Sequence, residues 1–248
     1  MIAVSVVSHG HESMVDRLLE QLLVCPEVSR IIVTRNIQES SNYPTDSRIS
    51  VVDNALPKGF GANHNAAFQM CRDEFFCVLN PDIEFLGNPF SVLLEALKSE
   101  RVAVAAPLVV SPAGLIEDSI RYFPRPAALL MKFLFKADGR YSAKPGQECF
   151  FPEWCAGMFM LFRSQDFERL GGFDERYFLY YEDVDICVRV WQQGVRVVAC
   201  PKVSVVHDAR RDSRRSLKHL RWHLASMMLF FWRHWGRLPS VPGSREFE

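Results

Sequence analysis

The sequence predicts an α/β fold, in which a mostly parallel, doubly wound sheet is followed by a C-terminal amphipathic helical segment. Apolar strands alternate with amphipathic helices along the first half of the chain, and this alternation builds a parallel sheet with helices on both faces. Hydrophobic residues make up 48% of the 248 residues and charged residues 23%, which is the balance of a globular domain with one core. We therefore expect one domain, residues 1–207, and an appended segment, residues 208–248.

Each element of this fold is expected from its own pattern. In the first half, buried apolar runs predict strands and helical periodicity predicts helices; in chain order these are strand 2–8, helix 14–24, strand 30–34, strand 49–52, helix 62–71 and strand 75–79. The second half is less regular, with a Pro- and aromatic-rich segment at 122–151. Around that segment we expect a helix from Leu93, strand 102–106, strand 154–162, helix 165–170, helix 182–193 and strand 203–206.

Charge and cysteine content narrow the function classes. Lys plus Arg and Asp plus Glu number 29 each, so no overall charge draws the protein to nucleic acid. The seven cysteines are scattered and never form a Cys-x-x-Cys pair, which predicts reduced thiols in a cytosol instead of a disulfide framework or a zinc site. The apolar run at residues 2–7 is too short for a signal peptide, and no run reaches the roughly 18 residues of a membrane span. We expect a cytoplasmic protein that is soluble or peripheral to a membrane.

Polar residues follow three of the predicted strands. Ser8, His9 and Gly10 follow the first strand, Arg35 and Asn36 the second, and Asn80, Pro81 and Asp82 the strand 75–79. Because parallel sheets bind ligands at the carboxyl ends of their strands, these residues are expected to line one crevice. The turn Gly59-Phe60-Gly61 opens a helix, where free amides suit a phosphate or the edge of a sugar. A plain tight turn explains the same Gly-x-Gly spacing equally well.

Acidic residues gather at the start of the predicted helix 182–193. Glu182, Asp183 and Asp185 lie in its first turn. The helix N-terminus favours their ionised forms, while mutual repulsion raises the pKa of the most buried carboxylate, and this combination makes a carboxylate a usable base. The alternative interpretation is a capping cluster.

Asp82 is a candidate metal ligand. It directly follows an apolar strand, where a carboxylate can bridge a divalent cation to a diphosphate. Mg²⁺ takes few protein oxygens and leaves its other positions to phosphate and water. The alternative is structural, because Asn80-Pro81-Asp82 would form a turn in any fold.

Together and in this order, the motifs resemble glycosyltransferase family 2, whose members have the Rossmann-like GT-A fold. The resemblance covers nearly the whole chain and rests on Val7-Ser8-His9-Gly10-His11, Gly59-Phe60-Gly61, Leu79-Asn80-Pro81-Asp82, Trp154-Cys155-Ala156-Gly157, Gly172-Phe173-Asp174 and Tyr181-Glu182-Asp183-Val184-Asp185. The set is most similar to bacterial O-antigen rhamnosyltransferases. It implies an inverting transfer of L-rhamnose from dTDP-rhamnose to a GlcNAc-diphosphate-polyprenol acceptor, with Mg²⁺ or Mn²⁺, in O-antigen or other cell-wall polysaccharide synthesis. Use of another nucleotide sugar is the alternative.

The resemblance also implies roles for individual residues. Asp183 corresponds to the catalytic base. Asp82 corresponds to the remaining carboxylate of the family's Asp-x-Asp metal motif, with neutral Asn80 in the first place. His207 corresponds to a histidine that closes on the metal or the diphosphate, although a lone histidine is more often structural. The implied acceptor contacts are Trp154, Cys155 and Glu182, and the implied contacts to the nucleotide sugar are Ser8, His9, Gly10, Asn36, Gly59, Phe60, Gly61, Asn65, Asn80 and Asp82.

One position departs from the family pattern. Many relatives end the second strand with an acid that contacts the nucleotide base, whereas this chain has Arg35, followed by the expected Asn36. The pair Asp53-Asn54 is not a replacement, because it ends the third strand. The choice between thymine and uracil therefore stays open.

The C-terminal segment is basic and amphipathic. Its apolar residues recur at helical spacing at Leu217, Leu220, Leu224, Met228, Phe231 and Trp235, beside a stripe of Arg214, Lys218 and Arg221. Such a helix predicts peripheral binding to the inner face of the cell membrane, since each basic residue near anionic lipid adds about 1 kcal/mol. The alternative is a helix packed on the core with a solvated rim.

Two other function classes stay open from the residues alone. The basic and aromatic residues near the C-terminus also suit a nucleic-acid-binding module, although Glu182, Asp183 and Asp185 would repel phosphates. A metal-dependent sugar nucleotidyltransferase would instead carry a Gly-rich basic loop after its first strand, where this chain has Ser8-His9-Gly10-His11. We therefore expect an enzyme whose partners are a nucleotide sugar, a lipid-linked acceptor and an anionic membrane surface, without nucleic acid.

Overall fold

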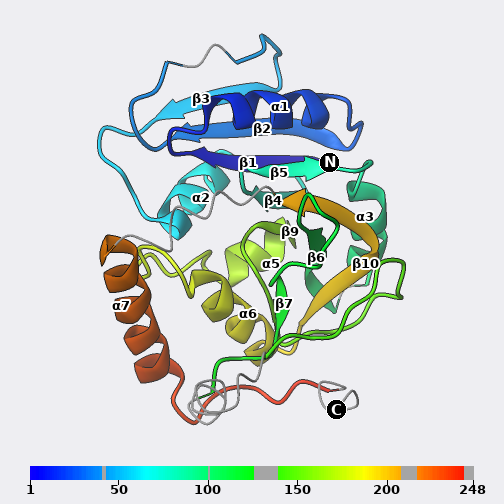
Figure 1. Cartoon of the computed structure of the whole chain (residues 1–248), viewed down its shortest axis with the longest axis vertical. Coiled ribbons are helices and arrows are strands. Elements are labelled where there is room, and N and C mark those ends of the chain that lie inside the picture. The colour runs from blue at the N-terminus through cyan, green and yellow to red at the C-terminus, as the bar shows by residue number, and fades with distance from the viewer. Residues whose placement is uncertain (41–42, 100, 126–138, 208–216, 243–248) are drawn as a thin grey trace.

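The structure is a computed structural model and describes residues 1–40, 43–99, 101–125, 139–207 and 217–242. Its main element is an eight-stranded sheet with the strand order β3-β2-β1-β4-β9-β6-β10-β5 (Figure 1). The strands of this sheet are β1 (Ile2–Ser8), β2 (Val28–Arg35), β3 (Ile49–Asp53), β4 (Phe75–Leu79), β5 (Ile83–Phe85), β6 (Val102–Val110), β9 (Phe159–Arg163) and β10 (Arg196–His207). A separate two-stranded sheet pairs β7 (Ile120–Arg121) with β8 (Trp154–Cys155).

Most strand pairs of the main sheet are parallel, as the alternation of strands and helices predicted. β1 pairs in parallel with β2 and β4, β2 with β3, and β6 with β10. Two strands run the other way: β9 is antiparallel to β4 and β6, and β5 is antiparallel to β10 at the edge. The carboxyl ends of β1, β4 and β10 therefore lie at the same edge of the sheet as the first residue of β9.

The predicted strand 154–162 is wrong as a single element. Its first part is β8 in the small sheet, and its second part is β9, which enters the main sheet between β4 and β6. The chain changes sheets at residues 156–158, where Gly157 donates its amide to Asp183 and the carbonyl of Met158 accepts from the amide of Asn80. Hydrogen bonds to other segments thus replace the ladder bonds that one continuous strand would make.

Helices cover both faces of the sheet, which confirms the doubly wound arrangement. On one face lie α1 (Glu12–Leu23) and α3 (Phe90–Leu97), and on the other lie α2 (Phe60–Phe68), α5 (Ser164–Arg169) and α6 (Glu182–Gln192). The buried side of α1 consists of Met14, Val15, Leu18, Leu19 and Leu22, which is the helical spacing that the sequence showed. The sheet is therefore enclosed by two apolar layers.

The C-terminal helix α7 (Leu217–His234) stands beside α6 and the loop that leads into it (Figure 1). Its buried side consists of Ser226, Phe230 and His234, spaced by four residues. Its opposite side is apolar and exposed at Leu217, Leu220, Leu224, Met228 and Trp232. The helix therefore packs on the core and also keeps an apolar outer face. Among the helices within the described ranges, none combines the length and the apolar character needed to cross a membrane.

The turn Gly59-Phe60-Gly61 owes its glycines to packing. A Cβ atom on Gly59 would lie 2.6 Å from the carbonyl oxygen of Phe178, and one on Gly61 would lie 2.6 Å from Cβ of Phe173. The Phe60 amide also donates to the Phe178 carbonyl, N to O 2.9 Å. The Phe60 ring packs edge-on to that of Phe173, with the centroids 5.8 Å apart. Close packing against the loop before α6 therefore explains why both positions are glycine.

Replacing Gly59 by Ala is expected to destabilise the fold by about 1–3 kcal/mol, because the added methyl group meets backbone that cannot move aside. Gly87→Ala is the matched control, since nothing lies within 4 Å of a Cβ at that position, and its effect should stay within about 0.5 kcal/mol. Urea denaturation of both variants measures the difference. Equal unfolding free energies would show that the loop before α6 moves away freely.

Candidate active site

The candidate site lies where the carboxyl ends of β4 and β10 meet the segment between β8 and β9. Asn80 follows β4, and its amide donates to the Met158 carbonyl, N to O 2.9 Å. The neighbouring Gly157 donates to the carboxylate of Asp183 at the start of α6. His207, the last residue of β10, lies against Asp82. The structure thus brings Asn80 and Asp82, which the sequence assigned to this edge of the sheet, together with Asp183 and His207.

Asp183 is held by main-chain amides at the N-terminus of α6. Its Oδ2 accepts from the amide of Gly157 at 3.0 Å, and its Oδ1 accepts from the amide of Val184 at 2.8 Å. Burial raises the pKa of Asp183, and it outweighs these amides and the charge of Arg121, which lower it. A positioned carboxylate with a raised pKa is suited to act as a general base.

The other two carboxylates of the cluster have different surroundings. Glu182 is buried, its Oε2 has no partner within the described part of the chain, and burial together with the nearby Asp183 raises its pKa well above the usual range. Asp185 is fully buried and accepts from Arg189 Nε at 2.7 Å and pairs with His234 Nε2 at 2.8 Å. Burial opposes its charge, but His234 and Arg189 lower its pKa. Asp185 therefore ties α6 to α7 and is not part of the crevice.

His207 lies between two carboxylates. Its Nε2 is 3.1 Å from Oδ2 of Asp82, and its Nδ1 is 2.9 Å from Oε2 of Glu117. Burial opposes the charge of His207, but the hydrogen bonds and charges of Asp82 and Glu117 outweigh it and raise the pKa of the imidazole. No motif marks Glu117 in the sequence. The fold brings it from 90 residues away.

The donor set at Asp82 fits a divalent cation that also binds phosphate. The second carboxylate oxygen of Asp82, Oδ1, is buried and lacks a partner within the described ranges, so it can accept a cation without losing a hydrogen bond. Across those ranges, no group of three or more His, Cys, Asp or Glu side chains is arranged to hold a metal ion. Asp82 and His207 would therefore share such a cation with ligand oxygens, as Mg²⁺ sites commonly do.

The residues after β1 lie at the open end of the sheet. His9 and Gly10 are exposed, whereas Ser8 is buried and donates its hydroxyl to Glu39, Oγ to Oε2 2.8 Å. The other oxygen of Glu39, Oε1, is buried without a partner in the part of the chain that the structure describes. No motif pointed to Glu39. Many relatives nevertheless carry an acid at the end of the second strand, where this chain has Arg35, and Glu39 is an acid four residues later.

Arg35 and Asn36, which end and follow β2, are occupied by structural contacts. Arg35 forms a two-bond ion pair with Asp53, Nε to Oδ1 2.6 Å and Nη2 to Oδ2 2.7 Å, and Asp53 ends β3 as expected. Asn36 is buried, and its amide bonds to both main-chain groups of Lys58 and to the side chain of Asn54. This amide therefore holds the turn before α2, and the predicted contact of Asn36 to the nucleotide sugar stays a prediction.

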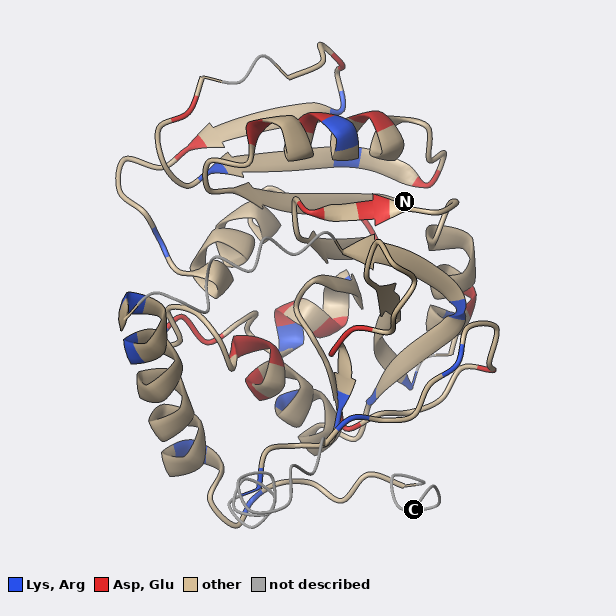
Figure 2. Ribbon diagram, viewed as in Figure 1, with Lys and Arg blue, Asp and Glu red and all other residues tan. Residues whose placement is uncertain are grey.

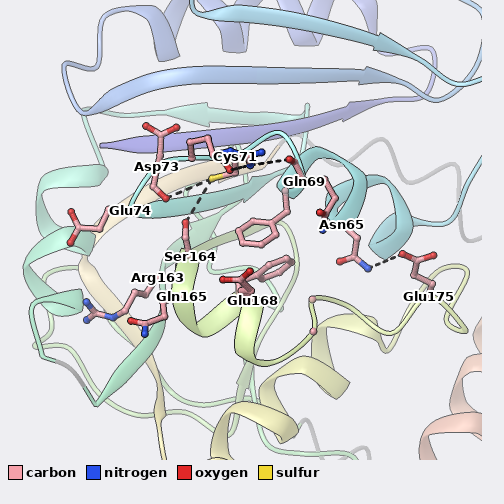
Figure 3. A pocket seen from close by; sticks show the side chains of 15 residues that line it. Asn65, Gln69, Cys71, Asp73, Glu74, Arg163, Ser164, Gln165, Glu168 and Glu175 are labelled. Atoms are coloured by element: carbon pink, nitrogen blue, oxygen red, sulfur yellow. Dashed lines mark hydrogen bonds between the residues drawn. The ribbon is translucent and has the colours of Figure 1, made fainter.

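Asn65 does not belong to the crevice. Its Oδ1 accepts from the amide of Phe173 and its Nδ2 donates to the carbonyl of the same residue, both at 2.9 Å. Nδ2 also donates to Glu175 at 3.0 Å. Figure 3 shows Asn65 and Glu175 in the wall of a cavity of about 840 Å³, which also includes Asp73 and Glu74 just before β4. Since this cavity lies at the amino end of β4, Asn65 lies apart from Asp82 and Asp183, and its predicted contact to the nucleotide sugar stays a prediction.

The predicted acceptor contacts differ in accessibility. Trp154 is partly exposed, its Nε1 donates to the carbonyl of Tyr122 at 2.9 Å, and the guanidinium carbon of Arg121 lies 5.9 Å from its ring centroid. Cys155 is 1% exposed, and a hydrogen bond with Cys187 together with burial raises the pKa of its thiol well above the usual range. The Cys155 side chain thus belongs to the core, and its predicted acceptor contact stays a prediction. Arg121 is a residue near Asp183 that the sequence did not single out.

Two family models match the chain. Residues 27–169 match the model described as glycosyl transferase family 2, and residues 141–219 match that of the N-terminal domain of galactosyltransferase. Rhamnosyltransferase WbbL of Escherichia coli (strain K12) is 32% identical over 242 residues, which are 91% of this chain and 90% of that protein. The N-acetylglucosaminyl-diphospho-decaprenol L-rhamnosyltransferase of Mycobacterium tuberculosis (strain CDC 1551 / Oshkosh) is 32% identical over 180 residues, 67% of this chain and 59% of that protein.

Solved structures share the fold at low sequence identity. GalNAc-T7 with UDP, GalNAc and Mn²⁺ has a TM-score of 0.65 and 16% identity, covering 86% of this chain and 44% of that one. The mannosyltransferase PcManGT of Pyrobaculum calidifontis, with GDP-Man and Mn²⁺, has a TM-score of 0.59 and 15% identity, covering 92% and 64%. The chain thus spans less than two thirds of either structure, and the similarity supports the GT-A fold.

Replacing His207 by Gln is expected to destabilise the fold more at pH 6 than at pH 9. Because the folded pKa is raised, charged His207 stabilises the fold below its ordinary pKa of about 6.5, and this contribution is lost as the pH rises through the folded pKa. Losing hydrogen bonds to a charged group should cost about 1–3 kcal/mol at the lower pH. Urea denaturation without divalent cations measures it, and exposed His9→Gln is the control. An equal loss at both pH values would mean that His207 is not charged in the fold.

Proposed function

The chain belongs to glycosyltransferase family 2, and on this premise we propose that it is an inverting rhamnosyltransferase. Its donor is dTDP-rhamnose, and its acceptor is a GlcNAc-diphosphate-polyprenol. The observation that carries the proposal is the similarity to a rhamnosyltransferase along nearly the full length of both chains. Membership in this family leaves the nucleotidyltransferase and the nucleic-acid-binding alternatives without support. Use of another nucleotide sugar remains the competing outcome.

Asp183 is the proposed catalytic base. The amides of Gly157 and Val184 hold both of its oxygens, which directs the carboxylate toward the edge where Asn80 and Asp82 lie. In this position it takes the proton of an acceptor hydroxyl, and the oxygen attacks the anomeric carbon on the face opposite the nucleotide. One displacement inverts the anomeric centre. The raised pKa of Asp183 strengthens it as a base, provided that it is ionised at the working pH.

Asp82 and His207 form the proposed diphosphate end of the site. They would hold Mg²⁺ or Mn²⁺, which would offset the charge that develops on the departing diphosphate. His207 is kept in place by Glu117 on its other nitrogen, and such an outer partner fixes the orientation of a ligating imidazole. Asn80 lies in the same turn as Asp82. Its amide donates to the carbonyl of Met158, which directly precedes β9, and this bond joins the turn to that strand.

Glu39 is the proposed contact to the nucleotide base. Arg35 is occupied by Asp53, so the acid expected after the second strand is supplied four residues later. Ser8 orients the Glu39 carboxylate, and Oε1 is left to accept a hydrogen bond. A pyrimidine imide N–H is such a donor. Thymine and uracil both carry it, so the choice between them rests on the donor assay.

Incubation with a GlcNAc-diphosphate-lipid acceptor and a panel of donors tests the proposed function. We expect transfer from dTDP-rhamnose and little from UDP-glucose, UDP-GlcNAc or GDP-mannose, each with Mg²⁺, Mn²⁺ or EDTA. EDTA should abolish turnover if Asp82 and His207 hold the cation. Product mass and anomeric configuration, read by NMR, decide the outcome. Exclusive use of a UDP-hexose would overturn the rhamnose assignment.

Asp183→Asn is the control within the same assay. It preserves size and hydrogen-bonding capacity but removes the base, so kcat should fall at least about 100-fold while donor affinity stays nearly unchanged. If the variant kept within about tenfold of wild-type activity, which is a loss of under about 1.4 kcal/mol in transition-state stabilisation, another residue would have to be the base.

The outer face of α7 is the proposed contact to an anionic membrane surface at the inner face of the cell membrane. Its exposed residues are Leu217, Leu220, Leu224, Met228 and Trp232, and exposed Trp235 follows the helix. Lys218 and Arg221 are exposed on the same helix, which carries no Asp or Glu (Figure 2). Apolar and basic side chains together suit the interface of anionic lipid. Arg214 and the apolar run 129–135 lie outside the described residues.

Replacing Lys218 and Arg221 by Gln should weaken binding to anionic vesicles by about 2 kcal/mol at low salt, since each basic residue contributes about 1 kcal/mol there. Turnover on a short water-soluble acceptor should fall much less. Co-sedimentation with vesicles measures binding, and Arg17→Gln with Arg101→Gln is the control for two exposed charges elsewhere. Undiminished sedimentation would place membrane contact on another surface.

A further inference from the structure

Two left-handed residues directly precede the carboxylates of α6. Tyr180 has φ 70° and Tyr181 has φ 69°, and within the described ranges they are the only non-glycine residues with positive φ. Bulky side chains are unfavourable in this region, because Cβ crowds the backbone. Such a conformation persists only where surrounding contacts hold it. The contacts around this turn therefore set where Glu182 and Asp183 point.

The inner face of α7 supplies contacts to the turn at helical spacing. The Tyr180 hydroxyl and His219 Nδ1 share a hydrogen bond of 3.0 Å, and Ser226 Oγ donates to the Leu179 carbonyl at 2.9 Å. The ring of Phe230 lies 5.3 Å from that of Tyr181, centroid to centroid. His219, Ser226 and Phe230 follow one another by seven and four residues, which places them on one side of a helix. That side of α7 therefore contacts each of the three residues 179–181.

The last residues of α7 contact the chain both before and after the turn. His234 Nε2 lies 2.8 Å from Oδ1 of Asp185, inside the first turn of α6, and both side chains are buried. Arg233 bonds to Asp174 in the loop before the turn. A buried pair of this kind tolerates little displacement, because separating it removes a hydrogen bond from two buried polar side chains, although Asp185 keeps its bond to Arg189. The turn is thus bounded by contacts with α7 at its start, its middle and its end.

We propose that α7 positions the catalytic base, with His219 and Ser226 as positioning residues. Their hydrogen bonds hold Leu179 and Tyr180 in place, and the left-handed backbone of Tyr180 and Tyr181 directs the first residues of α6 so that Asp183 meets the amide of Gly157. Neither residue contacts Asp183. The inference rests on the proposed function only in taking Asp183 as the base. It also gives α7 two faces, one toward the base and one toward the proposed membrane surface.

The test compares kcat and donor KM of α7 variants on a water-soluble acceptor without vesicles, so that membrane binding does not enter. His219→Ala and Ser226→Ala should each lower kcat about tenfold, equivalent to about 1.4 kcal/mol, while donor KM changes by less than about twofold. His219→Asn places an amide near the position of Nδ1 and should restore most of the rate. Tyr180→Phe removes the same hydrogen bond from the other side with the smallest change in packing, and should also lower kcat.

Gln192→Ala is the matched control. Gln192 also joins α6 to the C-terminal segment, through Nε2 and the Arg237 carbonyl at 3.1 Å, but at the end of α6 far from the turn. It should leave kcat unchanged, and thermal unfolding of every variant verifies that the fold is intact. Wild-type kcat in His219→Ala, Ser226→Ala and Tyr180→Phe would overturn the inference, as would a loss that His219→Asn does not restore. An active Asp183→Asn enzyme would instead overturn the choice of base, so the two failures are distinguishable.

Discussion

The hydrogen bond from the Gly157 amide to the Asp183 carboxylate is the interaction on which the arrangement of the site depends. Gly157 lies at the point where the chain leaves the small sheet and enters the main sheet between β4 and β6. The next residue, Met158, accepts from Asn80 after β4. One short segment therefore aligns the start of α6 with the end of β4. Because a Cβ atom on Gly157 would lie 3.2 Å from the Phe60 ring and 3.5 Å from Cβ of Asp183, a larger residue there would disturb α2 and α6 together.

Burial gives the acidic residues of the site separate tasks. Burial and the nearby Asp183 raise the pKa of Glu182. Asp185 is buried with His234 and Arg189, so it remains ionised and binds α7 to α6. The same logic applies at the end of β10, where His207 lies between Asp82 and Glu117. Three neighbouring carboxylates in the sequence thus have three distinct electrostatic environments.

Several motif residues serve packing in this fold. Gly59 and Gly61 leave room for the loop that precedes α6, and the Asn65 amide binds the main chain of that loop. Asn36 holds the turn before α2 in the same way. The loop is contacted by α2 from one side and by α7 from the other. Residues of a family motif therefore support the turn before α6, where the backbone of Tyr180 and Tyr181 is left-handed.

The sequence by itself determined the α/β class, the strand ends that line the crevice and the segment that carries Asp183, because these follow from local periodicity and from the rule for parallel sheets. It did not determine the break of residues 154–162 into two sheets, nor the partners Glu39, Glu117 and Arg121. Those depend on contacts between distant residues, such as the 90 residues between Glu117 and His207. The amphipathic pattern of α7 likewise left open which face packs inward. Only the tertiary structure decided it, because Ser226, Phe230 and His234 find partners on the turn and on α6.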